Sequence, residues 1–324
     1  MNSEKKIVAF GEIMLRLTPP DMKMIYETRA FDACYGGTES NVLVGLSALG
    51  NKTEYLTALP QNELGDAVVR HLKSYSVGTE NIIRFGDTLG MYFLEEGFGV
   101  RSSKVIYNRR HSEVSKLEKG AFDYDKVFEN CDIFHISGIS FALSENVREL
   151  SIEMLKQAKN RGIKTSFDFN YRSKLWSETE AKAVFEKVIE YVDIVFCSEK
   201  DLRTFLGVDK NNFYNKYKSE YLVVREREIL SDGKHMASAA IFHNGATAVS
   251  ATEPFEVFER IGSGDAFAAG VLHSIKKDGE NIKAAVDFGL ASFVLKHAVR
   301  GDVLPADEKT VNCYLNNVSK DVSR

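Results

Sequence analysis

The sequence has few cysteines and no long apolar run. Its four cysteines, Cys34, Cys131, Cys197 and Cys313, are far apart and follow no metal-binding spacing. Cys131 and Cys197 lie in apolar segments, so we expect them in the core. No apolar segment is long enough to cross a bilayer, and the polar start 1–6 leads directly into a predicted strand, unlike a signal peptide. We therefore expect a cytoplasmic protein without a membrane partner.

The sequence also lacks a strong excess of one charge. Its 42 Lys and Arg against 46 Asp and Glu give a formal net charge of −4, and the basic residues are spread along the chain. This distribution argues against a nucleic-acid-binding surface. No internal repeat or low-complexity segment stands out in the 324 residues, and 44% hydrophobic content is ordinary for a globular protein with a full-sized core.

Short apolar runs alternate with longer amphipathic segments. The runs that predict strands are Ile7–Phe10, Thr53–Leu59, Ile133–Ile136, Lys164–Phe169, Ile194–Cys197 and Tyr221–Val224. The segments with helical spacing are Asn41–Leu49, Asp66–Tyr75, Glu145–Lys159, Glu178–Tyr191 and Ala284–His297. This alternation predicts a doubly wound α/β fold, with a mainly parallel sheet and helices on both faces. Ligands in such folds bind beyond the C-terminal ends of the strands.

Two regions interrupt this alternation. Ile13–Tyr35 and Leu89–Arg110 contain alternating apolar residues and glycines but no convincing helix, so we expect antiparallel hairpin strands there. Together they would form a small β layer apart from the main sheet. Such a layer can serve as a lid that excludes water from a transfer reaction. An edge extension of the sheet or a dimer contact explains the pattern equally well.

The segment Arg260–Gly270 carries the clearest chemical signal. Gly262 and Gly264 flank Ser263 just before a run of small and apolar residues that predicts a buried helix. Free N–H groups at a helix start bind anions such as phosphate. Asp265 follows at once, and a carboxylate beside a phosphate site suggests a base that accepts a proton from an attacking hydroxyl. The alternative is a helix cap, because Asp is a common N-cap residue.

Polar residues follow three other predicted strands or turns. Gly36 and Gly37 precede the helix that contains Asn41, an arrangement that allows close approach of a small polar molecule or simple capping of the helix. Phe167–Arg172 ends a strand, and Arg172 could hold a carboxylate or form a surface ion pair. Cys197–Asp201 opens a further helix, where Ser198 and Asp201 suit either a capping box or a position near a hydrated cation.

The chain resembles the PfkB carbohydrate kinases, which are ribokinase-type sugar kinases. The segment with Gly36, Gly37, Asn41 and Gly50 is similar to the N-terminal sugar-binding motif of that family, and Ile261–Gly270 is similar to its highly specific C-terminal signature. The resemblance covers essentially the whole chain. Within the family the chain is most similar to 2-keto-3-deoxygluconate kinases, in the segments Val105–Arg109, Phe134–Ile139, Asp168–Arg172 and Leu175-Trp176.

This resemblance implies a ribokinase-like fold and a kinase activity. The α/β kinase domain would comprise residues 1–12, 36–88 and 111–324, and the β lid residues 13–35 and 89–110. The activity would be Mg²⁺- and ATP-dependent phosphorylation of the C6 hydroxyl of 2-keto-3-deoxygluconate, with Asp265 as general base. The amides of Gly262, Ser263 and Gly264 would form the anion hole. The predicted substrate-binding residues are Gly36, Gly37, Asn41, Tyr92, Tyr107, Arg109, Ile139 and Arg172.

Arg109 and Arg172 carry the prediction that the substrate is acidic, since a neutral sugar needs no cationic clamp. For Tyr92 and Tyr107 the alternative is packing within the lid. Exposed apolar faces on the lid strands, together with the resemblance, predict a homodimer formed through the lid. No metal ligand is assigned.

The chain departs from the family pattern at the expected nucleotide site. Ser198 and Asp201 replace the usual metal-associated Asn and Glu, which shortens the reach of both side chains. Arg225 stands where the family has Lys or Thr, and the segment Arg225–Lys234 is expected to be a long charged loop in place of a Gly-x-x-Gly turn. Ser198, Arg225, Gly262, Gly264 and His297 are the predicted nucleotide-binding residues, His297 through the adenine. For His297 the alternative is a polar helix end near the C-terminal dipole.

Two other functions are consistent with the sequence. The first is a PfkB sugar kinase of the fructokinase or ribokinase type, which would prefer neutral sugars. The second is a non-catalytic, sugar-binding regulator descended from a kinase, for which the altered segment Arg225–Lys234 is the supporting feature. The intact Gly262–Asp265 motif argues against the regulator.

Overall fold

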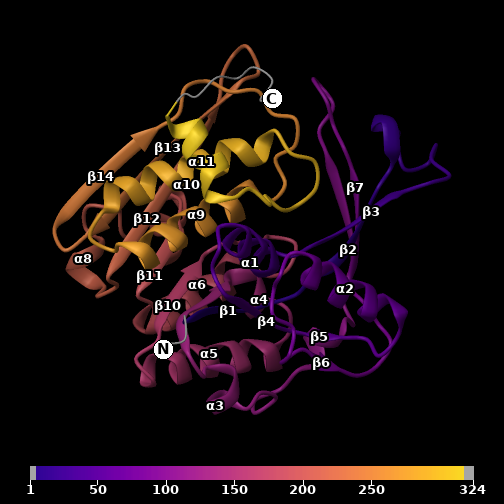
Figure 1. The fold of residues 1–324 in the computed structure, drawn as a ribbon, viewed down its shortest axis with the longest axis horizontal. Coiled ribbons are helices and arrows are strands. Elements are labelled where there is room, and N and C mark those ends of the chain that lie inside the picture. The colour runs from indigo at the N-terminus through magenta and orange to yellow at the C-terminus, as the bar shows by residue number, and fades with distance from the viewer. Residues whose placement is uncertain (1–4, 317–324) are drawn as a thin grey trace.

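A computed structural model describes residues 5–316, and its centre is an eight-stranded sheet with the strand order β14-β13-β12-β11-β10-β9-β1-β4 (Figure 1). The strands from β12 to β4 in this order are parallel, and the β12–β13–β14 edge is antiparallel. The strands are β1 (Lys6–Phe10), β4 (Thr53–Leu56), β9 (Cys131–Ser137), β10 (Lys164–Asp168), β11 (Ile194–Cys197), β12 (Tyr221–Ile229), β13 (His235–His243) and β14 (Ala246–Ala251). The predicted doubly wound α/β fold is confirmed.

Helices cover both faces of this sheet because its strands are apolar on both sides. In β1, Ile7 and Ala9 belong to the core on one face, and Val8 and Phe10 belong to the core on the other. The first core is shared with α1 (Thr38–Ala48), α2 (Glu63–Ser74), α9 (Ser263–Lys277) and α10 (Ile282–His297). The second core is shared with α4 (Gly138–Phe141), α5 (Glu145–Asn160) and α6 (Glu178–Val188).

The sequence determines where several helices begin. The Ser144 side chain caps α5 by accepting the Val147 N–H, and Ser177 and Glu180 form a capping box at α6. The shorter elements are η1 (Pro20–Met22), β5 (Ala58–Leu59), β6 (Ile83–Arg84), η2 (Glu113–Lys116), α3 (Tyr124–Val127), η3 (Ile189–Tyr191), α7 (Glu199–Asp201), η4 (Leu202–Leu206), α8 (Phe213–Lys216) and α11 (Glu308–Leu315). No helix within residues 5–316 is long and apolar enough to cross a membrane.

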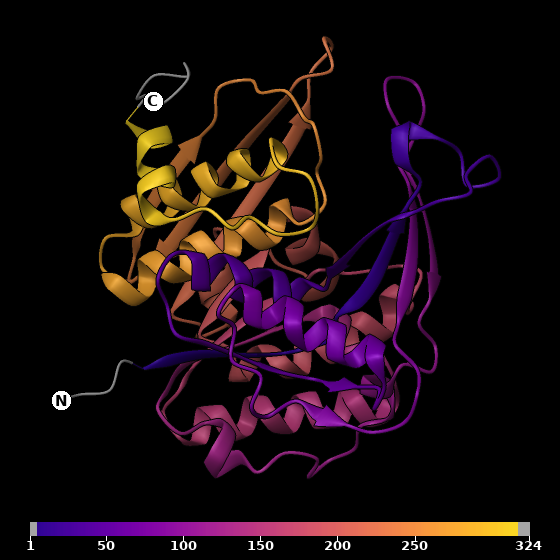
Figure 2. The ribbon, with the colours of Figure 1, turned by 45° about the vertical axis from the view of Figure 1, so that its right-hand side comes forward.

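A separate four-stranded sheet, called the small sheet below, stands off from the main sheet (Figure 2). Its strands lie in the order β3-β2-β7-β8, where β2 is Met14–Thr18, β3 Asp32–Gly36, β7 Met91–Glu95 and β8 Lys104–Asn108. The pairs β2–β3 and β7–β8 are antiparallel, which confirms the predicted hairpin strands. A parallel pairing of β2 with β7 joins the two hairpins into one sheet.

The sequence predicted a loop over Arg225–Lys234, and this prediction is wrong. Strand β12 continues to Ile229, and its outer half pairs with β13 as an antiparallel ribbon that turns at Leu230–Lys234. Charged side chains are compatible with this strand because the outer half of β12 is largely exposed, so it needs no apolar face. The β13–β14 hairpin was also missed, although its Asn244-Gly245 turn is a strong hairpin signal.

A buried carboxylate positions α1 at the C-terminal edge of the sheet. Glu39, in the first turn of α1, accepts hydrogen bonds from the N–H and Oγ of Ser137 and from Oγ of Ser140. Its side chain also fills the space beside Gly11, where a Cβ would overlap the carboxylate. These contacts connect the start of α1 to the end of β9, so Gly36 and Gly37 are held where ligands bind in such sheets.

Candidate active site

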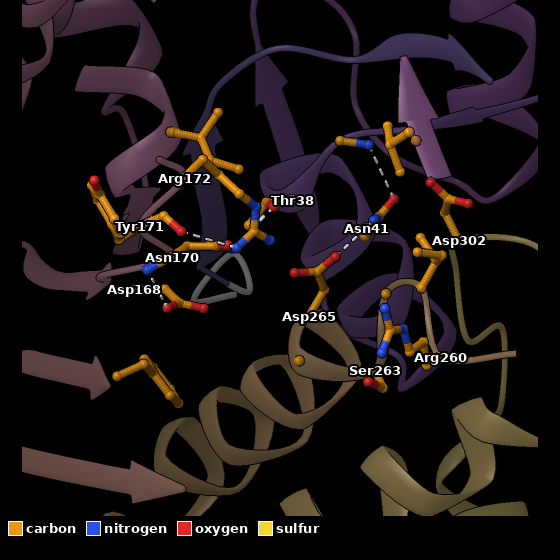
Figure 3. A pocket seen from close by; sticks show the side chains of 18 of the residues that line it. Thr38, Asn41, Asp168, Asn170, Tyr171, Arg172, Arg260, Ser263, Asp265 and Asp302 are labelled. Carbon is orange, nitrogen blue, oxygen red and sulfur yellow. Dashed lines mark hydrogen bonds between the residues drawn. The ribbon is translucent and has the colours of Figure 1, made fainter. Parts of the chain in front are cut away.

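A cavity of about 810 Å³ lies between the small sheet and the C-terminal edge of the main sheet. It contains nearly all of the residues that the sequence singled out, although they are distant along the chain. Those that line it are Gly36, Gly37, Asn41, Tyr92, Tyr107, Arg109, Ile139, Arg172, Ser198, Arg225, Gly262, Ser263, Gly264 and Asp265. Figure 3 shows Asp265, Asn41, Arg172 and Ser263 grouped in this cavity.

The N-terminus of α9 opens into the cavity through the Gly262–Gly264 turn. Gly262 has φ = 78°, and a Cβ there would overlap the Asp302 carbonyl oxygen, so the turn requires glycine. The Ser263 N–H donates to the Arg260 carbonyl at 3.3 Å. Within residues 5–316, the N–H groups of Gly262 and Gly264 have no acceptor. Free amides at the start of a 15-residue helix provide an anion-binding site.

Asp265 is a buried carboxylate in the first turn of α9, with 8% of its surface exposed. Its Oδ2 accepts a hydrogen bond of 2.7 Å from Nδ2 of Asn41, and Oδ1 of Asn41 accepts the Gly37 N–H at 3.3 Å (Figure 3). Burial raises the pKa of Asp265 to about 7, Asn41 opposes the rise, and Asp168 adds to it. A carboxylate with this pKa is suited to accept a proton near neutral pH.

The two predicted clamp arginines differ in their surroundings. Arg109 is buried and forms an ion pair with Glu12, which also accepts a hydrogen bond from Oγ of Ser112. Arg172 donates only to the Tyr171 carbonyl, at 3.3 Å, and has no acidic partner among the described residues. The charge of Arg109 is therefore already balanced, whereas the charge of Arg172 is available to an anionic ligand.

Tyr92 and Tyr107 bring the small sheet to the edge of the cavity, with ring centroids 5.9 Å apart. Tyr107 is 39% exposed, and the Arg109 guanidinium lies 5.6 Å from its ring centre. Tyr92 is buried and donates through its hydroxyl to Oδ2 of Asp302, at 2.5 Å. Tyr107 is thus the more accessible of the two to a ligand.

Asp302 connects the small sheet to the α9 turn. Its Oδ1 lies 2.5 Å from Nη1 of Arg16 in β2, and the same nitrogen lies 2.5 Å from Oε1 of Glu259. A Cβ at Gly36 would overlap the Asp302 carboxylate. The small sheet, the Gly36 turn and the α9 turn therefore meet around one buried carboxylate.

Three predicted nucleotide-site residues have different environments. Ser198 and Asp201 form the capping box of α7, which was one of the two open interpretations. The Arg225 guanidinium lies 4.6 Å from the Phe293 ring centre and close to Gly264. His297 is fully buried, its Nδ1–H donates to the Phe293 carbonyl oxygen at 2.7 Å, and the side chain does not line the cavity.

The His297 side chain packs in the core beside Phe255 and Phe293, and its role at the adenine stays a prediction.

Sequence reasoning missed several residues that line the cavity: Glu12, Lys174, Arg227, Arg260 and Asp302. Arg260 lies two residues before Gly262 and could have been found from its position. Arg227 could have been found from the alternation along β12, had the segment been recognised as a strand. Nothing in the sequence around Asp302 indicates its contacts with the small sheet, because they depend on tertiary packing.

Comparison with known proteins places this geometry in a family. The model of the pfkB family carbohydrate kinases matches residues 4–306. The 2-dehydro-3-deoxygalactonokinase of Haloferax volcanii is 34% identical over 306 residues, which are 92% of each chain. The crystal structure of 2-dehydro-3-deoxygluconokinase from Thermotoga maritima has a TM-score of 0.92 and 34% identity, and covers 97% of this chain and 98% of that one.

The fold is shared more widely. A fructokinase from Xylella fastidiosa, solved with bound ATP, has a TM-score of 0.80 at 22% identity and covers 97% of this chain and 99% of its own. These matches define a carbohydrate kinase of ribokinase-like fold. The chain belongs to the PfkB family of carbohydrate kinases.

The raised pKa of Asp265 predicts a pH-dependent effect on stability. The folded pKa of about 7 exceeds the ordinary value of 3.8, so the folded state holds a proton that the unfolded state has lost between these two values. The resulting stabilisation is complete below about pH 4 and is lost as the pH rises through 7. Asp265→Asn should therefore raise the melting temperature by a few degrees at pH 8.5, with a difference that shrinks toward pH 4. Equal melting temperatures at pH 8.5 would show that Asp265 is not destabilised by burial.

Proposed function

We propose that this protein is an ATP-dependent kinase that phosphorylates the C6 hydroxyl of 2-keto-3-deoxygluconate. The observation that carries the proposal is the pairing of two groups in one cavity. A buried carboxylate, Asp265, lies at a helix start with free N–H groups, and an arginine without an acidic partner, Arg172, lines the same cavity. The first group suits phosphoryl transfer to a hydroxyl, and the second suits an acidic sugar.

The sugar acid would bind between the lid, which is the small sheet and its connections in residues 13–35 and 89–110, and the edge of the main sheet. Arg172 would bind its carboxylate, with Tyr107 and Ile139 alongside and Gly36 and Gly37 allowing close approach. Arg109, held by Glu12, would donate to the substrate through its remaining nitrogens; its buried Nε has no partner among the described residues. Fixing the sugar at both ends would align its hydroxyl with Asp265.

Asp265 would accept the proton of the attacking hydroxyl, oriented for this role by its hydrogen bond to Asn41. The free amides of Gly262 and Gly264, with the adjacent Arg225, would stabilise the charge on the transferring phosphoryl group. Asp168 and Asp201 are the oxygen donors in the cavity that fit a hydrated Mg²⁺, which would neutralise charge on the phosphates when bound. Burial raises the pKa of Asp168 to about 6, so it is largely ionised at neutral pH.

A second substrate is favoured by one of the comparisons. The relative from Haloferax volcanii, 34% identical, is a 2-dehydro-3-deoxygalactonokinase. We therefore include 2-keto-3-deoxygalactonate, a sugar acid of the same class, as a second candidate. Both sugar acids present the carboxylate that Arg172 would bind, so the arginine does not discriminate between them.

The central test is the variant Asp265→Asn, assayed by ADP release with both sugar acids, fructose and ribose. We expect the wild type to phosphorylate the sugar acids. The variant should lose at least about a thousandfold in kcat, because it lacks the general base. It should still bind the sugar acid in calorimetry, because the cavity is unchanged. Undiminished turnover of the variant would contradict the mechanism. A wild type that acts only on neutral sugars, or on no sugar, would contradict the proposed function.

Arg172→Ala should lower kcat/KM for the sugar acid by about 10- to 100-fold, because a charge-assisted contact to the carboxylate is worth about 1.5–3 kcal/mol. The KM for ATP should stay within about twofold. Lys200→Ala is a control that removes an exposed cation outside the cavity. If Arg172→Ala leaves kcat/KM for the sugar acid unchanged, the clamp is elsewhere.

We also propose a homodimer formed through the outer face of the small sheet. This sheet and its connections carry large exposed apolar side chains, including Tyr26 (80% exposed), Phe98 (78%) and Ile106 (55%). Light scattering coupled to gel filtration should give a dimer for the wild type and a shift toward monomer for Ile106→Asp, since a buried carboxylate opposes association. A monomeric wild type at micromolar concentration would contradict the dimer.

A further inference from the structure

The arginines around the cavity fall into two groups. Arg16 and Arg109 are buried and form ion pairs with carboxylates. Arg225, Arg227 and Arg260 also line the cavity, but none of their side chains forms a salt bridge or donates a hydrogen bond to any residue between 5 and 316. The first group therefore has its charge balanced within the protein. The second group presents three positive charges without a salt-bridge partner in residues 5–316 to the same space.

The β12–β13 ribbon places two of these arginines on one face. Arg225 and Arg227 are two residues apart in a strand, so their side chains point to the same side. Their partners across the ribbon are Ala239 and Ala237, which supply no carboxylate. Glu226 points to the other side, where its Oε1 accepts the Glu199 N–H at 2.6 Å.

Arg260 comes from a different element and reaches the same region. It lies two residues before Gly262 of the α9 turn, and Figure 3 shows it beside Ser263 at the N-terminal end of that helix. Arg227 and Arg260 line the same cavity, and burial, followed by the charge of Arg260, lowers the pKa of Arg227. Two like charges that approach without a counterion are unfavourable until an anion binds between them.

We infer that Arg227 and Arg260 form a clamp for the phosphate chain of the nucleoside triphosphate. This inference rests on the proposed kinase function and adds two phosphate-binding residues to its nucleotide site. The charged ribbon would replace the glycine turn that the sequence lacks, so that guanidinium groups supply the phosphate contacts otherwise made by backbone amides. Arg225, beside Gly264, would hold the phosphoryl group nearest to the anion-binding amides, and the pair Arg227–Arg260 would hold the remaining phosphates.

The test uses Arg227→Ala and Arg260→Ala, with two measurements on the full chain. In steady-state kinetics each variant should raise the KM for ATP about tenfold or more and leave the KM for the sugar acid within about twofold. In calorimetry each should weaken binding of inorganic tripolyphosphate about tenfold relative to wild type. Arg227→Lys should bind tripolyphosphate more tightly than Arg227→Ala but less tightly than the wild type. The lysine ammonium keeps the positive charge but cannot donate the two parallel hydrogen bonds of a guanidinium.

Lys234→Ala is the matched control. It removes one positive charge from the turn of the same ribbon, outside the cavity, and should leave both measurements unchanged. If tripolyphosphate affinity and the KM for ATP are unchanged in both arginine variants, or if Lys234→Ala changes both as much as the arginine variants do, the clamp is wrong. Failure of the proposed kinase function gives a different result: no wild-type turnover on any sugar acid. The tripolyphosphate measurement still decides the clamp in that case.

Discussion

The cavity depends on the contact between two helices that come from opposite ends of the chain. α1 and α9 pack closely because Gly45 faces Ala269, and a Cβ at Gly45 would lie 2.9 Å from that of Ala269. At the cavity end of this contact, Nδ2 of Asn41 donates to Asp265 across 2.7 Å. One hydrogen bond thus joins the Gly36-Gly37 turn to the anion-binding turn. If the helices moved apart, the carboxylate would lose its orientation and the two turns would no longer border one space.

The charges that the cavity presents to a ligand depend on which side chains already form ion pairs within the protein. Arg16 and Arg109 are buried, and each needs a carboxylate because an unpaired buried charge is costly. Both arginines come from the region of the small sheet, so these ion pairs also hold that sheet over the cavity. Asp265 is also buried but has only an amide partner, which is why its pKa rises to about 7. The charges of Arg16 and Arg109 are balanced by carboxylates inside the protein. Asp265 has no ion-pair partner among the described residues, so its charge is available to a ligand.

Much of the fold followed from the alternation of apolar runs and amphipathic segments, because strands buried on both faces are continuous apolar runs. The failures have physical causes. The segment 225–234 was expected to be a loop because its charges suggested one, yet an edge ribbon needs only backbone pairing. The sequence placed His297 at a helix end but did not give the direction of its side chain, which depends on packing against Phe255 and Phe293. Arg109 was predicted as a clamp for an acidic substrate, but its ion pair with Glu12 was not foreseen, because the two residues are 97 positions apart.

The sequence by itself determined the anion-binding turn. Glycines at 262 and 264 before an apolar helix specify free amides locally, and Asp265 is attached to them by chain position. Only the tertiary structure decided which charges are compensated. Glu12 pairs with Arg109, Asp302 pairs with Arg16, and Arg227 and Arg260 line the cavity without a salt-bridge partner in residues 5–316. Electrostatic pairing depends on distances through space between residues on different elements, and such distances are set by how the sheets and helices pack.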